Sequence, residues 1–340
     1  MRQPCDWVDH IPSGSLPIYF TQAYQSLFAE HDGAKTVSVC INDGVSEWYL
    51  PLLLRKIGDR VYEAYTAYGY GGILSATGST VSMALLEKLR KFLQEENVVC
   101  AFIRHSPFLG NQEWLPRGQS EFNRTTYVRT LTQGGDLDKF SASSPQKLRW
   151  SINYARRHDL MTHFHPLKTC KESLIREFYS IYHGLMDGKK TNNYYLFSEE
   201  FFQKHALHFG DNCELAAVHD PSSGKLIAAA FFLLDGADWA HYHLSASHRD
   251  FMKLQPVELM MAEATLRYGN AGYRNLHLGG GHAADESDGL SRFKKKFATE
   301  SRPFHLSRWV CDDIRYQAER ARLTLKYPNF FLISDARGEA

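Results

Sequence analysis

The sequence predicts an α+β fold in which mixed, mostly antiparallel sheets are flanked by helices. Three observations support this prediction. Runs rich in β-branched and aromatic residues are typical of strands, short connections such as "NDGVS" and "PSSG" join neighbouring runs, and longer segments repeat apolar residues at helical spacing. The order of strands, helix and further strand occurs in both halves of the chain. We therefore expect the two halves to share an architecture.

The first half begins with three predicted strands. The runs "TVSVCI", "EWYLPLLLRKI" and "RVYEAYTAY" are separated by "NDGVS" and "GD" turns, which predicts an antiparallel meander from Thr36 onwards. The glycine-rich "YGYGGILSATGS" interrupts this meander, "TVSMALLEKLRKFLQEEN" has helical spacing, and "VVCAFIRHSP" is typical of a strand. This half is expected to form one compact unit.

A polar connection is expected between the halves, at "TLTQGGDLDKFSASSPQ". The helix "PQKLRWSINYARRHDL" should follow at once, with Ser144 as its N-cap and Pro145 at its first position. Its apolar stripe consists of Leu148, Ile152 and Ala155.

The second half continues with alternating predicted elements. After the strand "MTHFHPL" come two helices, "KESLIREFYSIYHGLMDG" and "SEEFFQKHALHFG". Three strands joined by "PSSG" and "GA" turns follow, then a helix that Gly272 closes, and then the strand "YRNLHLG".

Composition limits the classes of protein to consider. The 340 residues are 44% hydrophobic and 23% charged, which is ordinary for a globular protein. The formal net charge of +1 gives no global electrostatic case for DNA, RNA or an anionic membrane, so any site for a polyanion must be local. No signal peptide and no run of about eighteen apolar residues occurs, which predicts a cytoplasmic protein without a membrane span.

The cysteines and histidines do not predict a metal centre. Six widely spaced cysteines without a CxxC pair are typical of reduced thiols. The pairs His163 with His165 and His241 with His243 alternate on predicted strands, but acidic and cysteine partners at ligand spacing are missing. We interpret these histidines as packing or surface residues and expect no metal.

The segment "LHLGGGHAADESDGLSRFKKKF" combines two signals. Gly279, Gly280 and Gly281 end a predicted strand, where bare backbone allows either a sharp turn or the close approach of a ligand. A short helix with Lys294 and Lys295 beside its buried edge follows. Ammonium groups close to exposed backbone N–H groups can bind a phosphate or an oxyanion.

Two weaker signals occur elsewhere. The "AYGYGGIL" segment lies between a strand and a helix but matches neither GxxxxGK[ST] nor GxGxxG, so an aromatic-packed turn and a ligand cradle are both open interpretations. Arg149, Asn153 and Arg156 lie together on the helix after Pro145, as either a solvated basic face or a phosphate site. No GxSxG motif or catalytic cysteine setting occurs, which favours chemistry in which the substrate supplies the nucleophile.

These segments together resemble a known family. The order "KLRWSINYARRHDL", "GKLIAAAFFLLDG", "YHLSAS", "NLHLGGG" and "DGLSRFKKKF" is similar to that of the FemABX-like branch of the GNAT acyltransferase superfamily. Within this branch, the "YGYGG" segment resembles that of members associated with bacterial surface-polysaccharide assembly. The resemblance covers about residues 36–325 and implies two tandem GNAT-like domains, at 1–135 and 136–340.

The resemblance also implies an activity. FemABX enzymes move an amino acid from aminoacyl-tRNA to an amine of a peptidoglycan precursor, and related GNAT members use acyl-CoA. In both reactions an amine attacks an activated acyl carbon, and the resulting oxyanion must be stabilised. We therefore expect an N-acyltransferase acting on an amino sugar or a nucleotide- or lipid-linked sugar of cell-envelope or polysaccharide biosynthesis. Its donor would be acyl-CoA or aminoacyl-tRNA.

Site residues follow from the same resemblance. The lysine of the family's Phe-Lys segment corresponds to Lys294, which would neutralise the oxyanion or a substrate phosphate. Tyr242 or His243 would relay the amine's proton, and His243 is favoured because its reference pKa of about 6.5 suits the task. Phosphates would be held by the family's basic helix, here Lys147, Arg149 and Arg156. The further candidates for substrate binding are Tyr70, Gly71, Gly72, Gly279, Gly280, Gly281, Arg292 and Lys295.

The sequence departs from ordinary GNAT members at one place. Where these hold the CoA pyrophosphate on a glycine-containing turn, this chain has "SHRDFMKLQPVELM". Either the "YGYGG" turn binds the donor or the donor is not CoA. Two further hypotheses stay open: an aminoacyl-tRNA-dependent transferase, which the near-neutral charge does not favour, and a GNAT-like binding module without turnover.

Overall fold

The computed structural model describes residues 5–8, 16–75, 77–187, 195–236, 238–282, 284–322 and 326–337. The chain divides into two compact units. Unit 1 comprises residues 1–123 and 303–340, and unit 2 comprises residues 124–302. From the sequence we expected a boundary between residues 135 and 136. The structure instead divides the chain after residue 123, and residues 303–340 return to unit 1, where β13 pairs with β6.

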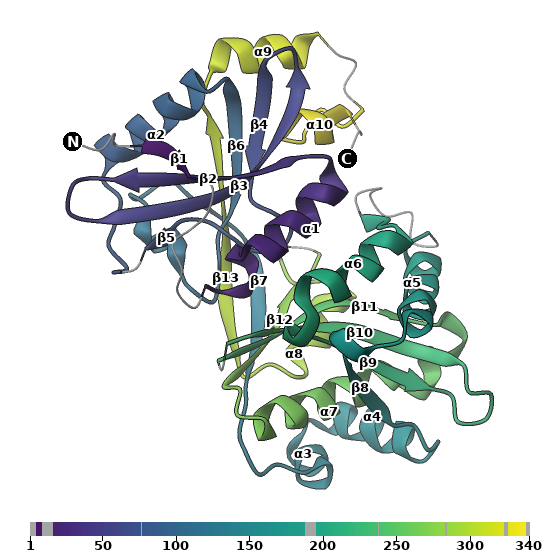
Figure 1. The fold of residues 1–340 in the computed structure, drawn as a ribbon. Coiled ribbons are helices and arrows are strands. Elements are labelled where there is room, and N and C mark those ends of the chain that lie inside the picture. Colours follow the sequence, from purple (N-terminus) through teal and green to yellow (C-terminus); the bar gives the residue numbers. More distant parts are fainter. Residues whose placement is uncertain are drawn as a thin grey trace. The chain divides into compact units, whose positions relative to one another are not determined.

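Unit 1 is a sheet in the order β1-β2-β3-β4-β6-β13 (Figure 1). Its strands are β1 (Cys5–Val8), β2 (Lys35–Asn42), β3 (Glu47–Gly58), β4 (Val61–Tyr65), β5 (Leu74–Ser75), β6 (Val98–Arg104) and β13 (Glu300–Val310). Its helices are α1 (Gln22–Asp32), α2 (Met83–Glu95), α9 (Asp313–Ala321) and α10 (Ile333–Arg337), with 3-10 turns η1 (Ile18–Phe20) and η2 (Asn111–Trp114). The expected meander β2-β3-β4 is antiparallel, and β6 returns parallel to β4 after α2.

Unit 2 repeats this order as β8-β9-β10-β11-β12-β7. Its strands are β7 (Glu121–Thr130), β8 (Thr162–Pro166), β9 (Cys213–His219), β10 (Leu226–Asp235), β11 (Trp239–Ser247) and β12 (Asn275–Gly280). Its helices are α3 (Leu137–Ser143), α4 (Gln146–Arg156), α5 (Glu172–Asp187), α6 (Glu199–Phe209), α7 (Pro256–Asn270) and α8 (Gly289–Lys295), with 3-10 turns η3 (Leu167–Thr169), η5 (Gly210–Asn212) and η6 (Arg249–Leu254). β9, β10 and β11 are antiparallel, and β12 returns parallel to β11 after α7. The shared architecture expected from element order is therefore present.

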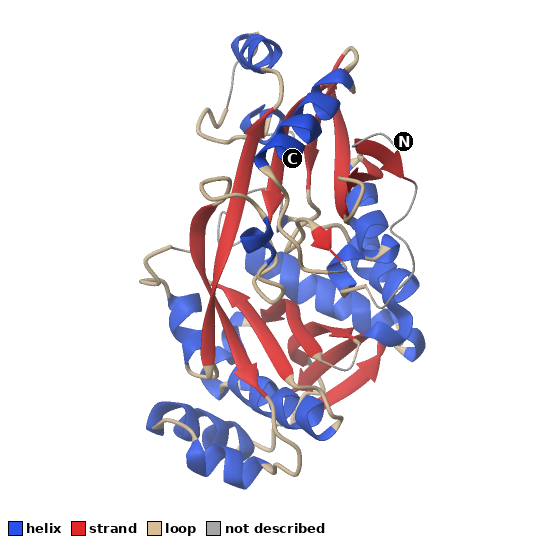
Figure 2. Ribbon diagram, turned by 90° about the vertical axis from the view of Figure 1, so that its left-hand side faces the viewer, coloured by secondary structure: helices blue, strands red, loops and turns tan. Residues whose placement is uncertain are grey.

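Helices lie against the strands of each unit (Figure 2), and this explains the apolar run of β10. Successive side chains of a strand point to opposite faces. Phe231 meets Phe178 of α5, with ring centroids 4.9 Å apart, whereas Phe232 meets Tyr268 of α7 at 5.3 Å. Both faces of β10 are thus buried, so the strand has no polar alternation.

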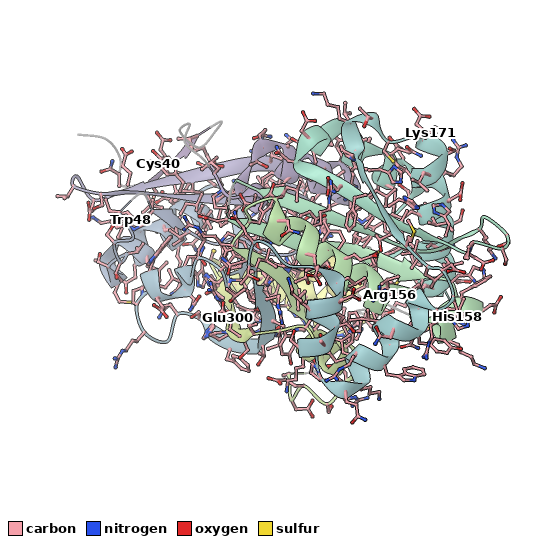
Figure 3. The ribbon with its side chains drawn as sticks, turned by 90° about the horizontal axis from the view of Figure 1, so that it is seen from below. Cys40, Trp48, Arg156, His158, Lys171 and Glu300 are labelled. Atoms are coloured by element: carbon pink, nitrogen blue, oxygen red, sulfur yellow. The ribbon has the colours of Figure 1, made fainter. Side chains whose placement is uncertain are left out.

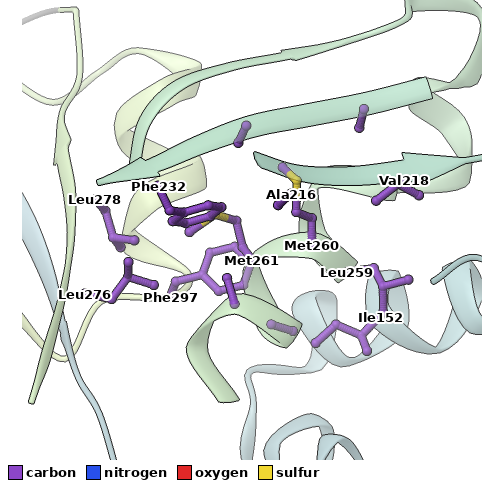
Figure 4. Packing of buried hydrophobic residues seen from close by; sticks show 14 of the residues in the cluster. Ile152, Ala216, Val218, Phe232, Leu259, Met260, Met261, Leu276, Leu278 and Phe297 are labelled. Atoms are coloured by element: carbon purple, nitrogen blue, oxygen red, sulfur yellow. The ribbon is translucent and has the colours of Figure 1, made fainter. Parts of the chain in front are cut away.

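The core of unit 2 joins α4, α7 and the sheet (Figure 4). The expected stripe of α4, Leu148, Ile152 and Ala155, is buried in it. Phe297 is also part of this core and lies 5.4 Å from Phe293 between ring centroids, which anchors the segment around α8.

Two local predictions at the start of unit 2 are wrong. The expected polar connection contains helix α3, because Asp136 caps it by accepting a hydrogen bond from the backbone N–H of Lys139. Ser144 does not cap α4. Its hydroxyl donates to the Phe140 carbonyl at the end of α3, so Pro145 takes the N-cap position and α4 begins at Gln146.

Candidate functional site

The parallel strands β11 and β12 stop pairing before either strand ends. Their register runs from Trp239 opposite Asn275 to His241 opposite His277, yet β11 continues to Ser247 and β12 to Gly280. Beyond this point the two strands no longer bond to each other, so backbone N–H and C=O groups on the facing sides need other partners.

A β-bulge lies on each strand just past this point. Leu244 and Tyr242 face consecutive residues of β10, which makes His243 the extra residue in β11. In β12 the extra residue is Leu278, because His277 and Gly279 face consecutive residues of β7. Bulges bend a strand and redirect its side chains, and they are frequent next to active sites. The geometry therefore marks the end of β12 as the candidate site.

The glycines at this end leave no room for side chains. Gly279 has φ +75°, a conformation that favours glycine. A Cβ on Gly280 would lie 3.0 Å from the Thr125 carbonyl oxygen, and one on Gly281 would lie 1.8 Å from Ser291 Oγ. Backbone is thus brought close to β7 and to α8, which accounts for the triple glycine.

Lys294 is turned towards this backbone. Its Nζ donates to the Gly280 carbonyl oxygen at 2.7 Å, and the residue is only 8% exposed. Burial lowers the pKa of Lys294 to about 7; the carboxylate of Asp288 acts in the opposite direction and the guanidinium of Arg124 in the same direction. A buried ammonium is costly unless an anion compensates it. Lys294 is therefore a cation that a negatively charged ligand would stabilise.

Sequence reasoning missed two charged residues close to Lys294, Arg124 and Asp288. Arg124 of β7 donates to the Gly281 carbonyl oxygen at 2.7 Å, so two cations hold successive carbonyl groups. Asp288 caps α8 by accepting from the backbone N–H groups of Leu290 and Ser291, and it also accepts from Ser291 Oγ at 2.7 Å. Asp288 was detectable as an acidic residue before a helical pattern, whereas nothing in the segment around Arg124 indicated its role.

The other cations of this segment diverge to separate partners. Arg292 donates to the Ser287 carbonyl oxygen. Lys295 pairs with Glu286, which lowers the pKa of that carboxyl group to about 2. Lys296 is 3.2 Å from Glu258 of α7. The structure thus brings Lys294 to the glycine backbone, whereas Arg292 and Lys295 of α8 bind residues of the preceding loop.

Tyr242 and His243 point to different faces of β11. The Tyr242 hydroxyl donates to Ser245 Oγ at 2.5 Å, and its ring is 5.5 Å from that of Phe232 on the α7 face. The His243 ring lies 5.6 Å from that of His205 of α6. Burial, with smaller contributions from His205 and His241, lowers the pKa of His243 well below its usual value. His243 was favoured as the base because an ordinary imidazole accepts a proton near neutral pH. Its lowered pKa makes it a weaker base, so that reason no longer applies.

The three cations assigned to the basic helix are exposed on α4. The Arg149 guanidinium donates to the Ser144 carbonyl oxygen at 3.3 Å, and Arg156 is 2.6 Å from Asp138 of α3. Lys147 lies in the first turn of α4. The helix presents these side chains to solvent rather than gathering them around one ligand.

The "YGYGG" segment belongs to unit 1, where neighbouring side chains fill the space around it. Asn111 donates to the carbonyl oxygens of Gly71 and Ile73 at 2.8 and 2.9 Å. Gly72 has φ +95°, and a Cβ there would lie 2.7 Å from Asn111 Nδ2. Tyr70 packs edge-on against Phe304, with ring centroids 5.3 Å apart. Packing alone accounts for these residues.

Two wider surveys cover the described parts of the chain. Among these residues no group of three or more His, Cys, Asp or Glu side chains is placed to hold a metal ion. Within the same parts, no helix has both the length and the apolar character needed to cross a membrane. The six cysteines are free thiols.

Comparison with known proteins agrees with this geometry. Residues 146–295, from the start of α4 to the end of α8, match the family described as "Acetyltransferase (GNAT) domain". This segment, which lies within unit 2, is therefore similar to a GNAT acetyltransferase domain. The family resemblance drawn from the sequence is thereby confirmed, and so is the prediction of an acyltransferase. None of the curated proteins matches the sequence.

Solved structures share the GNAT fold over most of the chain. FemX is 12% identical, with a TM-score of 0.63 over 91% of this chain and 95% of its own. The protein L-PGS from Bacillus licheniformis is 14% identical, with a TM-score of 0.51 over 84% of this chain and 91% of its own. A conserved protein of unknown function from Bacteroides thetaiotaomicron is 12% identical, with a TM-score of 0.51 over 84% of this chain and 88% of its own. At these identities the likeness concerns the fold, and the predicted α+β class with tandem GNAT-like units is confirmed.

Proposed function

We propose that this GNAT protein transfers an acetyl or aminoacyl group to the amine of a sugar or related precursor of the cell envelope or of a polysaccharide. The observation that carries the proposal is Lys294, a buried cation 2.7 Å from the Gly280 carbonyl oxygen, where β11 and β12 have stopped pairing. A cation in a poorly hydrated site is most useful where negative charge develops during the reaction.

The reaction follows from this arrangement. The neutral amine of the acceptor attacks the acyl carbon, the new C–N bond forms, and the carbonyl oxygen becomes an oxyanion. Lys294, in its ammonium form, neutralises that oxyanion. When the bond to the leaving group, the CoA thiolate or the tRNA ribose oxygen, breaks, the carbonyl is restored. The amine nitrogen gives up its proton, and the leaving group takes up a proton in exchange. Because the oxyanion favours the ammonium form, its approach raises the low pKa of Lys294.

The separated strands provide a place for an extended substrate. Residues 242–247 of β11 and 278–280 of β12 no longer pair with each other. An extended chain that carries amide groups binds such a strand edge through backbone hydrogen bonds. We place the acyl donor along this edge, with its acyl carbon near Lys294. The exposed Arg149 is the proposed contact for an acceptor phosphate.

Either acyl-CoA or aminoacyl-tRNA is the proposed donor, and the turn before α7 bears on the choice. Gln255 occupies this turn with φ +61°, a conformation that glycine usually supplies. Its side chain accepts from Ser151 Oγ at 3.0 Å and donates to the Met252 carbonyl oxygen at 3.3 Å. One residue of this turn thus has a left-handed conformation, but its side chain stands where ordinary GNAT members have glycine.

Thermal unfolding in the presence of ligands tests the proposal. The purified protein is heated with acetyl-CoA, with CoA and with several UDP-amino sugars. A ligand at 100 times its dissociation constant adds about 2.7 kcal/mol to the free energy of unfolding, so binding should raise the midpoint visibly. A shift with both CoA species and a sugar nucleotide supports acyl-CoA-dependent transfer. If no CoA or sugar nucleotide shifts the midpoint, this form of the proposal is wrong.

The aminoacyl-tRNA alternative has a separate test. Binding of charged tRNA should weaken steeply as salt rises, because Lys and Arg contacts to phosphates release counterions. Fluorescence anisotropy of labelled tRNA between 50 and 200 mM salt measures this dependence. Binding that is undetectable, or independent of salt, excludes the alternative.

A further inference from the structure

The outer face of α4 and the turn that follows it carry three aromatic side chains in a row. Trp150 and Tyr154 have ring centroids 4.9 Å apart with an interplanar angle of 19°, and the Tyr154 and His158 rings are 4.4 Å apart. The spacing of four residues places all three on one side of the helix. The opposite side, with Leu148 and Ile152, is buried in the core of unit 2. We call Trp150, Tyr154 and His158 the aromatic stack.

Exposed apolar side chains lie on the aromatic stack and on the segments next to it. Trp150 is 51% exposed, and Met161, just beyond the helix, is 58% exposed. Met252, which is 52% exposed, belongs to η6, and η6 contacts α4. Exposed apolar side chains on adjoining segments are the material of an interaction surface.

Cations border the aromatic stack on the same side of the helix. Lys147 and Arg157 lie three residues before Trp150 and three after Tyr154, and the Arg157 guanidinium is 5.9 Å from the Tyr154 ring centroid. Within the described part of the chain, neither cation pairs with a carboxylate. Arg156, which lies on the side of α3, pairs with Asp138. The region is labelled at Arg156 and His158 in Figure 3.

The charge of this face favours an anionic partner. Lys147 and Arg157 lie on it, and Asp159 is the one carboxylate in residues 146–161. Single-stranded RNA and an anionic lipid surface both meet this requirement. RNA bases stack on aromatic rings, but the exposed side chains of Met161 and Met252 on the adjoining segments offer a base no ring face. Exposed methionines together with Trp150 and Tyr154 suit the headgroup region of a bilayer, where Trp and Tyr are favoured.

We propose that the outer face of α4 docks this protein onto an anionic phospholipid surface. Trp150, Tyr154 and Met161 enter the headgroup region, and Lys147 and Arg157 pair with lipid phosphates. Cations and an amphipathic apolar surface act together in such peripheral binding. The inference does not rest on the acyl-transfer proposal, since it concerns where the protein binds and not what it transfers.

Vesicle co-sedimentation of the full chain tests the proposal. Vesicles of equal parts phosphatidylglycerol and phosphatidylcholine are compared with pure phosphatidylcholine at low and high salt. We expect binding to the anionic vesicles that weakens as salt rises. The double variant Lys147→Ala/Arg157→Ala should bind about 30-fold more weakly, since each cation near such a surface contributes roughly fivefold. The double variant Trp150→Ala/Tyr154→Ala should bind about tenfold more weakly or worse.

Matched control variants lie in unit 1. Phe122→Ala removes an aromatic residue that is 53% exposed, and Lys91→Ala removes a cation whose side chain is 72% exposed. Both controls should bind vesicles like the unmodified protein. Circular dichroism and the thermal midpoint confirm that each variant is folded. Because all the changed side chains are exposed or half-buried, stability should stay within about 0.5 kcal/mol in controls such as these.

Several results would overturn the proposal. These are equal binding to neutral and anionic vesicles, no binding to either, or loss of binding in the control variants to the same extent. Anisotropy of a labelled single-stranded RNA that responds to the α4 variants while vesicle binding does not would assign the face to nucleic acid. Concentration-dependent dimerisation that only the α4 variants abolish would assign it to a second copy of the chain.

Discussion

Two glycine-rich segments of this chain look alike in sequence and differ in structure. Residues 69–72 of unit 1 and residues 279–281 of unit 2 both join a strand to a segment that leads into a helix. In the first, the Asn111 amide binds the carbonyl groups around Gly72, so neutral side chains complete the backbone's hydrogen bonds. In the second, cationic side chains take that role, and one of them, Lys294, is buried.

The difference shows what identifies a site in this protein. Glycine is required at both segments because a Cβ would collide with neighbouring atoms, so glycine alone does not separate packing from chemistry. A buried amide with complete hydrogen bonds is stable as it is. A buried ammonium with a carbonyl partner is still short of compensating negative charge. The following predictions test this contrast, from the largest expected effect to the smallest.

Removal of the buried cation should have the largest effect. Lys294→Ala is expected to lower the rate of acyl transfer about 100–1,000-fold, because one donor to the developing oxyanion is lost. Initial rates with the substrates identified by thermal unfolding measure this. The matched control is Lys295→Ala, whose side chain pairs with Glu286 at the surface and should leave the rate nearly unchanged. Full activity in Lys294→Ala would contradict the mechanism while leaving the fold untouched.

An alanine at Gly281 and an alanine at Gly72 should both destabilise the protein, but for different reasons. Gly281→Ala forces Ser291 Oγ away from Asp288 and should cost about 3 kcal/mol of unfolding free energy, measured by urea denaturation. Adding Ser291→Ala should recover part of this loss. Gly72→Ala should cost a similar amount, owing to its positive φ, without altering kcat/KM. A specific loss of donor affinity in Gly72→Ala would instead show that the unit 1 segment binds the donor.

The amide that supports the unit 1 segment should matter for stability. Asn111→Asp keeps an acceptor for the Ser106 backbone N–H but loses the donor to the carbonyl oxygens of Gly71 and Ile73. Leaving buried carbonyl groups without donors should lower the unfolding free energy by about 2 kcal/mol. Urea denaturation at constant pH is the measurement, and an unchanged midpoint would argue against this packing role.

The pH dependence of stability should report Lys294 itself. The pKa of Lys294 is about 7 in the folded chain, against an ordinary value of about 10.4 for an unfolded lysine. Between these values the unfolded chain binds more protons, so the free energy of unfolding should rise with pH. From pH 7 to pH 9 this contribution amounts to about 2 kcal/mol.

Lys294→Met provides the comparison for this slope. The variant keeps the length of the side chain and removes the titrating group, so its stability should lack the rise that the unmodified protein shows between pH 7 and pH 9. At pH 7 it should be at least as stable as the unmodified protein, because a buried charge is replaced by an apolar side chain. Identical pH profiles for the two proteins would mean that Lys294 is not desolvated in solution.

Sequence reasoning found most of the fold because its signals are local. The three strands of each meander and helices α2, α4, α5, α6 and α7 all follow from periodicity and turn residues. Among the elements it missed are β7, β13 and α3, where polar residues dominate, and it assigned Ser144 to the wrong helix end. In such segments pairing with a distant strand outweighs local preference.

The sequence by itself determined the α+β class, the order of elements, the glycine run and the importance of Lys294 among its neighbouring cations. Only the tertiary structure decided that Lys294 is buried, that Arg124 shares the glycine backbone with it, and that Arg292 and Lys295 bind elsewhere. The reason is physical. Periodicity and glycine act through the chain's own geometry, whereas desolvation and charge depend on what segments distant in sequence bring to the same place.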